Sequence, residues 1–332
     1  MKFHLAFDIK QMHQLIHHRH KIMLIGSCFT ENIGEKLKKH KFQVLENPNG
    51  ILFNPVSVAK TIATIIQNKK YTADDLFCLN ETWHSWQHHS RFSGITITEA
   101  LTKINTSTES AYSFLQTANY LLVTLGSAWV YTLTEHAANA NKGIVVANNH
   151  KAPANWFEKQ LMSAEQVKQG LKQVVDDLLK FNPSIEIIFT ISPVRHLREG
   201  VINNNRSKAI LIQAVHNLID EYKQLYYFPA YELVIDDLRD YRFYSEDLVH
   251  PNYAATEYVW EKFVEACMTE DTKVLMKQIA EINVAFQHKA FNVATKQHQK
   301  FLQSYFQKTT SLQANYPYLN FEQELKYFNQ LG

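Results

Sequence analysis

The chain has 332 residues, of which 45% are hydrophobic and 20% charged, and its formal net charge is +2. This composition excludes a disordered, collagen-like or low-complexity protein, and the balanced charge indicates neither nucleic acid nor an anionic membrane as a partner. No apolar run approaches the roughly 18–20 residues of a membrane-spanning helix, and the N-terminal residues lack the features of a secretory signal. We therefore expect a soluble globular protein of the cytoplasm.

Apolar, β-branched runs alternate with helical patterns along most of the chain. Strands are predicted at residues 21–26, 42–45, 120–126, 185–192 and near 233–236. Helices are predicted at residues 28–40, 56–67, 164–180 and 207–222. This alternation indicates right-handed βαβ crossovers and a parallel sheet, in which a ligand binds at the carboxyl ends of the strands.

The residue pattern of the sequence changes after Cys267. Residues 271–307 contain neither glycine nor proline, and apolar residues recur there at nearly helical spacing. A helical extension packed on the core is favoured over a coiled coil, because the spacing drifts from a strict heptad. We therefore divide the chain into a domain of residues 1–267 and a C-terminal helical extension of residues 268–332.

Ser27 directly follows the first predicted strand. Gly26 permits a tight turn there, and the start of the following helix favours negative charge beside the serine. The alternative is that Ser27 only caps this helix, which is a common role for serine. Taken alone, the position favours the cap.

Asp247 and His250 form an Asp-x-x-His pattern late in the chain. On a turn, residues three apart can face each other, so the Asp247 carboxylate can bind one ring nitrogen of His250 and leave the other free to accept a proton. The alternative is an incidental pair on a surface loop. The pattern gains weight only in combination with Ser27.

Together, a serine after the first strand and a late Asp-x-x-His resemble the SGNH (GDSL-like) hydrolase superfamily. The stretch Gly26-Ser27-Cys28-Phe29-Thr30 further resembles the signature of the GSCFA family, with threonine in place of the final alanine. Other family-like stretches follow in order between residues 49 and 244, among them NGILFNP, HSRFS, TLGSAWVY and SPVRH. The resemblance covers residues 20–265 and implies an α/β fold, a three-layer α/β/α flavodoxin-like domain with a parallel sheet of about five strands.

The resemblance makes Ser27 the nucleophile, His250 the general base and Asp247 its orienting partner. The backbone N–H groups of Ser27 and Gly50 become oxyanion donors. The superfamily's third donor, an asparagine, is missing from Gly126-Ser127-Ala128-Trp129. Ser127 is a short substitute, and Asn149 or its neighbour Asn148 is another.

The activity implied is that of a serine esterase acting on small acyl esters, with O-acetyl groups of carbohydrate as the favoured substrates. An acyltransferase with the same triad is one alternative. An inactive carbohydrate-binding or scaffold protein on the same fold is another. The sequence leaves the acyl group, the acceptor and the oligomeric state open.

Several residues are candidates for binding substrate. Arg195 and His196 follow the fourth strand, although Arg195 could equally pair with a carboxylate such as Asp236 or Asp237. Trp83, His89 and Arg91 belong to an aromatic and basic stretch for which core packing is slightly favoured over a sugar pocket. Trp129, in the family-like stretch TLGSAWVY, completes the candidates.

No metal or cofactor is expected. The histidine run at 17–20 and the three scattered cysteines match no metal-ligand spacing, and the sparse cysteines are typical of a reducing compartment. Cys28 is a less favoured nucleophile than Ser27, because the side chains of adjacent residues diverge. The glycine-rich nucleotide-binding motifs and the Gly-x-Ser-x-Gly elbow are absent.

Overall fold

A five-stranded parallel sheet forms the centre of the molecule in a computed structural model that describes residues 5, 7–137 and 142–329. The strand order is β2-β1-β5-β8-β9. The strands are β1 (Lys21–Gly26), β2 (Gln43–Glu46), β5 (Tyr120–Leu125), β8 (Glu186–Ile191) and β9 (Leu225–Tyr227). This order is that of flavodoxin-like folds, so the predicted fold class is confirmed.

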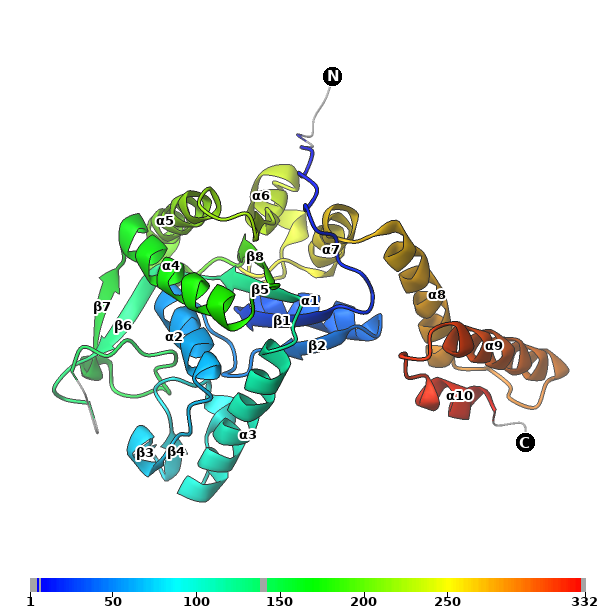
Figure 1. The fold of residues 1–332 in the computed structure, drawn as a ribbon, viewed down its shortest axis with the longest axis horizontal. Helices are drawn as coiled ribbons and strands as arrows, with labels where there is room; N and C mark the ends of the chain where they lie inside the picture. The colour runs from blue at the N-terminus through cyan, green and yellow to red at the C-terminus, as the bar shows by residue number, and fades with distance from the viewer. Residues whose placement is uncertain (1–4, 6, 138–141, 330–332) are drawn as a thin grey trace.

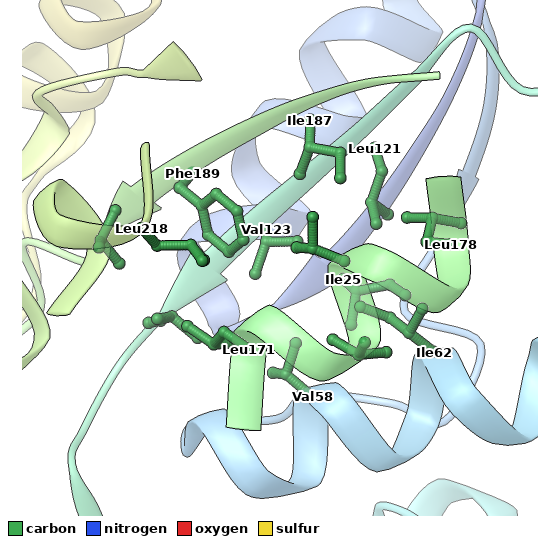
Figure 2. Packing of buried hydrophobic residues seen from close by; sticks show 14 of the residues in the cluster. Ile25, Val58, Ile62, Leu121, Val123, Leu171, Leu178, Ile187, Phe189 and Leu218 are labelled. Atoms are coloured by element: carbon green, nitrogen blue, oxygen red, sulfur yellow. The ribbon is translucent and has the colours of Figure 1, made fainter. Parts of the chain in front are cut away.

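One face of the sheet is covered by four helices. These are α2 (Pro55–Ile66), α3 (Ile97–Leu115), α4 (Ala164–Phe181) and α5 (Gly200–Ile219). Figure 2 shows side chains of three neighbouring strands, Ile25, Val123 and Phe189, facing α2 and α4. All six residues of β5 are buried, which explains why its sequence is a continuous apolar run rather than an alternating one.

The opposite face is covered by α1 (Cys28–Lys39) and α7 (Tyr253–Cys267). Ile33 of α1 and Phe263 of α7 belong to one buried cluster with Leu24 and Leu122 of the sheet. The two clusters on the two faces make the domain a three-layer α/β/α structure. The carboxyl ends of all five strands lie along one edge of it.

Two antiparallel hairpins and several short helical turns lie in the connections. The hairpins are β3 (Phe77–Leu79) with β4 (Thr82–His84), and β6 (Trp129–Leu133) with β7 (Phe157–Leu161). The short turns are η1 (Ala73–Asp75), η2 (Ser90–Phe92), η3 (Ala154–Trp156), η4 (Leu197–Glu199), α6 (Ala230–Glu232), η5 (Leu233–Asp237) and η6 (Tyr241–Phe243).

The strand predicted near residues 233–236 is wrong. Residues Leu233–Asp237 form a π-helical turn, and the fifth strand is Leu225–Tyr227. Pro229 begins the helical segment, and its carbonyl accepts a hydrogen bond from the N–H of Leu233 at 3.0 Å. The apolar run is therefore buried by helical packing against the sheet, which local β propensity does not reveal.

The C-terminal extension consists of α8 (Glu270–Gln287), α9 (Lys296–Asn315) and α10 (Glu322–Phe328). Its helices share an apolar cluster of their own and stand to one side of the sheet (Figure 1). Contacts with the first domain include the ion pair between Lys41 and Glu324 and the bond from Asn283 Nδ2 to the carbonyl of Lys39. Within the described residues, none of the helices is long and apolar enough to cross a membrane.

Candidate active site

Ser27 lies at the end of β1, in the turn that leads into α1. Its side chain is completely buried, and the backbone before it has φ = +148° at Gly26. The residue occupies the N-cap position of α1, but its side chain makes no capping hydrogen bond. Among the described residues its Oγ has no hydrogen-bond partner at all. Capping therefore does not explain this serine. A buried hydroxyl without a hydrogen bond costs free energy, so we expect another role for it.

Asn47 holds this turn in place from the end of β2. Its Oδ1 accepts a hydrogen bond from the N–H of Gly26 at 2.9 Å, and its Nδ2 donates to Glu31 Oε1 at 3.4 Å. Arg91 completes the network, because its Nη1 donates to Glu31 Oε1 at 2.9 Å and its Nη2 donates to the carbonyl of Asn47 at 3.3 Å. Arg91, a predicted substrate-binding residue, is thus engaged in supporting the Ser27 turn. Sequence reasoning missed Asn47, whose only signal is a polar residue directly after a strand.

Asp247 and His250 face each other on a loop before α7. The distance from His250 Nδ1 to Asp247 Oδ2 is 2.7 Å, and Asp247 Oδ1 accepts the N–H groups of Val249 and His250 at 2.9 and 3.0 Å. The bonds from the backbone and ring of His250 lower the pKa of Asp247 to about 2, so the carboxylate stays ionised. Its charge favours a proton on Nδ1, which leaves Nε2 as the acceptor.

Arg195 joins this loop to the carboxyl end of β8. Its N–H donates to the carbonyl of Val249 at 3.2 Å, and its Nη1 donates to the carbonyl of Leu248 at 3.1 Å. The guanidinium also lies 4.1 Å from the centre of the Tyr244 ring. Arg195 therefore contacts neither Asp236 nor Asp237 through an ion pair within the described chain. It holds the Asp247–His250 loop at the edge of the sheet where Ser27 lies.

A buried cation, Lys208 of α5, also reaches this edge. Its Nζ donates to the carbonyls of Gly126 at 2.7 Å and Ser192 at 2.6 Å, which follow β5 and β8. Burial lowers the pKa of Lys208 to about 7. The nearby Cys28 thiol has a raised pKa, again because of burial, which keeps it protonated. Lys208 was not found from the sequence, because a single lysine in a helical pattern gives no signal of burial.

His196 lies near both Lys208 and the Asp247–His250 pair. Burial, with smaller effects from Lys208 and His250, lowers the pKa of His196 to about 3, so the ring is neutral. Its Nε2 is buried without a hydrogen-bond partner among the described residues. Its ring packs edge-on against Phe53 at 5.0 Å between ring centres.

The two predicted backbone donors of the oxyanion site are already engaged in this structure. The N–H of Ser27 donates to the carbonyl of Thr124 at 3.3 Å, and the N–H of Gly50 donates to the carbonyl of Asn47 at 2.7 Å. Ser127 Oγ accepts the N–H of Trp129 at 3.1 Å. No hydrogen bond joins Ser27 and His250, both of which lie in the described part of the chain.

A cavity of about 330 Å³ opens beside His196. Ser127, Trp129 and Asn149 line it, as does Asn148. Trp83 instead lies in β4 and packs against a small buried cluster, and the N–H of His89 donates to the carbonyl of Asn49 at 2.8 Å. The structure thus brings Trp129, His196, Ser127 and Asn149 to one cavity and leaves Trp83 outside it. Within the described ranges, no three His, Cys, Asp or Glu side chains are grouped as a metal site.

The sheet order and the two flanking helical layers define a three-layer α/β/α protein with a flavodoxin-like parallel sheet. The chain belongs to the GSCFA family, whose model matches residues 21–263. The model "GSCFA domain protein, C-terminal domain" matches residues 279–331, within the extension.

Three solved structures show distant similarity to this chain. A Streptococcus pneumonia protein provisionally described as a platelet activating factor is 12% identical, with 74% of this chain and 83% of that chain covered and a TM-score of 0.40. A family 3 carbohydrate esterase from Talaromyces cellulolyticus is 10% identical, with coverages of 79% and 99% and a TM-score of 0.35. A Clostridium thermocellum family 3 carbohydrate esterase is 11% identical, with the same coverages and a TM-score of 0.31. No curated protein sequence matches the chain.

Proposed function

We propose that this protein is a serine esterase that hydrolyses small acyl esters, with O-acetyl esters of carbohydrate as its substrate class. One observation carries the proposal. A buried serine hydroxyl that has no partner among the described residues and an imidazole held by a carboxylate belong to the same edge of the sheet. A hydroxyl that is free to be deprotonated, with a base oriented for the task, is what nucleophilic acyl transfer requires.

In the proposed reaction, Ser27 Oγ attacks the acyl carbon and its proton passes to Nε2 of His250. The Asp247 carboxylate stabilises the imidazolium that forms. Collapse of the tetrahedral intermediate breaks the ester bond, and His250 returns the proton to the departing alcohol. Water, deprotonated by His250, then attacks the acyl carbon. The bond to Ser27 Oγ breaks, the acyl group leaves as a carboxylic acid, and His250 returns the proton to Ser27 Oγ. Each step requires the His250 ring to come within hydrogen-bond distance of Ser27 Oγ, to which it is not bonded among the described residues.

The oxyanion requires donors that are free to turn toward it. The bond from the N–H of Ser27 to Thr124 is long at 3.3 Å, so this donor can be recruited at little cost. The N–H of Gly50 has a shorter bond of 2.7 Å, so its use requires the loop after β2 to move. We propose Ser127 and Asn149 as the polar side chains that take the place of the missing asparagine.

The same engaged N–H groups favour a second candidate function. A protein that retains the fold and the cavity but has no working oxyanion site would bind carbohydrate without cleaving its esters. This candidate predicts that Ser27 does not react with a serine-directed reagent. The esterase proposal predicts that it does.

Hydrolysis of a chromogenic acetyl ester by the wild-type protein and by Ser27→Ala tests the proposal. We expect the variant to lose roughly 10⁴-fold or more in kcat, because the nucleophile is removed. Cys28→Ala is the matched control, since its thiol is adjacent to Ser27 and takes no part in the mechanism. Its rate should equal that of the wild type.

Equal background rates for wild type and Ser27→Ala, together with an unlabelled Ser27 after treatment with a fluorophosphonate, would reject the esterase. Labelled Ser27 with acyl transfer to a sugar alcohol in preference to water would instead identify an acyltransferase. Loss of activity in Cys28→Ala alone would move the nucleophile to the thiol.

A further inference from the structure

The cavity beside His196 continues into a second one of about 560 Å³. Both cavities are lined by Tyr131, Asn148, Asn149, Arg198 and Glu199, so they form one continuous depression, here called the Tyr131 groove. It begins at His196 and Ser127, at the carboxyl edge of the sheet, and runs along the β6–β7 hairpin. Nothing in the proposed acyl-transfer chemistry uses its outer part.

Aromatic rings and amides line the groove. Trp129 lines the first cavity and has Lys159 Nζ 4.1 Å from the centre of its ring, while the Tyr131 hydroxyl donates to Glu199 Oε1 at 3.0 Å. The amide side chains of Asn148 and Asn149 provide both donors and acceptors. Flat apolar rings beside amides suit a sugar ring, which presents C–H faces and hydroxyl edges.

The charges in the groove do not cancel. Lys159 forms an ion pair with Glu199, which neutralises both groups. Arg198 has no ion pair within the described residues, and its guanidinium lies 5.3 Å from the centre of the Tyr131 ring. Lys151 likewise lines the second cavity without an acidic partner in the described chain. A groove for a neutral sugar would not need two uncompensated cations.

The loop that contains Asn148 and Asn149 is held in an unfavourable backbone conformation. His150 and Lys151 have φ values of +49° and +57°, in the left-handed region that residues with a Cβ rarely adopt. The buried His150 ring maintains the loop, because its Nε2 lies 2.9 Å from the carbonyl of Ser85 and its Nδ1 lies 3.2 Å from Ser90 Oγ. Such strain persists where the surroundings enforce it, and it is typical of binding sites.

We propose that the Tyr131 groove binds the sugar part of the substrate and that this sugar carries an anionic group bound by Arg198. The inference rests on the proposed function for the location of the reacting ester, but the binding itself does not require catalysis. Arg198 offers a planar pair of donors that matches a carboxylate, and the neighbouring Tyr131 ring keeps the guanidinium oriented. Phosphate on a sugar has the same recognition chemistry, so the test includes both anions.

Binding is measured by calorimetry on the Ser27→Ala protein, so that no turnover interferes. The probes are a galacturonic acid trisaccharide, the matched neutral galactose trisaccharide and galactose 1-phosphate. We expect the uronate to bind at least about tenfold more tightly than the neutral sugar at low salt, with a difference that shrinks as salt rises. The affinity for galactose 1-phosphate, compared with that for the uronate, decides whether carboxylate or phosphate is preferred.

Arg198→Gln should remove most of this preference, whereas Arg198→Lys should retain part of it. Arg206→Gln is the matched control, because Arg206 lies on the following helix, is bonded to Asn203 and does not line the groove. Equal affinity for acidic and neutral sugars, or no binding of any of the probes, would overturn the proposal. If the protein hydrolyses esters but binds acidic and neutral sugars equally, only the groove inference is rejected. If it prefers acidic sugars but hydrolyses no ester, only the esterase proposal is rejected.

Discussion

The turn at Ser27 and the loop at His250 supply the two halves of the proposed mechanism, and they are built in opposite ways. Both contain a residue in the left-handed region, Gly26 with φ = +148° and Leu248 with φ = +57°. Ser27 is completely buried between strands, whereas the side chains of His250 and Asp247 are 51% and 48% exposed. The proposed nucleophile is therefore positioned by the sheet, and the proposed base is positioned by short-range bonds within a surface loop.

Adding a methyl group at Gly26 should have the largest effect. A Cβ there would lie 2.2 Å from the backbone carbonyl oxygen of Thr124 on the neighbouring strand, and φ is unfavourable for alanine. We expect Gly26→Ala to lower the free energy of unfolding by roughly 3 kcal/mol or more, because the strands must separate locally. Urea denaturation measures the change.

The control for this variant is Gly170→Ala in α4, where an added Cβ meets nothing within 4 Å. It should raise the free energy of unfolding by about 0.5–1 kcal/mol, as is usual for this change in a helix. A Gly26→Ala protein as stable as the wild type would mean that the turn can relax and that Ser27 is not fixed by the sheet.

Asp247→Asn should leave stability unchanged and reduce activity. The carboxylate is at the surface, so its removal exposes no buried group, but the His250 ring loses the charge that sets its tautomer. We expect kcat for an acetyl ester to fall roughly 10²–10⁴-fold. Because the pKa of Asp247 is lowered to about 2, the wild-type carboxylate is ionised at both pH 6 and pH 8, so its own protonation does not contribute to the loss measured at either pH.

Asp240→Asn is the matched control, since Asp240 is an acidic residue of the same region that bonds the N–H of Arg242 at 2.8 Å and does not contact His250. An Asp247→Asn protein with full activity would show that His250 does not depend on this carboxylate. Asp247 would then have no part in the chemistry proposed for it.

Leu248→Gly should have the smallest effect and sharpens the contrast with Gly26. Relief of the left-handed conformation and the greater freedom of the unfolded glycine oppose each other, so stability should change by less than about 1 kcal/mol. The loop becomes more flexible, and we expect kcat to fall by less than about tenfold. Asn80→Gly, in the β3–β4 hairpin turn with φ = +49°, should leave kcat unaltered.

A Leu248→Gly protein that unfolds as readily as Gly26→Ala would contradict the difference between the two regions. The Asp247–His250 loop would then be part of the cooperative core.

The sequence by itself determined the parts of this protein that depend on neighbours in the chain. The buried strands 21–26 and 120–125 can be recognised from their apolar runs. The Asp247–His250 pair follows from a three-residue separation on a turn. The serine after the first strand is likewise a local feature. That its hydroxyl has no hydrogen-bond partner within the described part of the chain, by contrast, became visible only once its surroundings were known.

Only the tertiary structure decided which distant groups meet. Asn47 binds the N–H of Gly26 across 21 residues, Arg91 reaches Glu31 across 60, and Lys208 binds the carbonyl of Gly126 across 82. The same holds for the segment 233–237, whose apolar run is helical because it packs against the sheet. Hydrogen bonding and burial depend on what the folded chain brings alongside, and no periodicity within a short window encodes those partners.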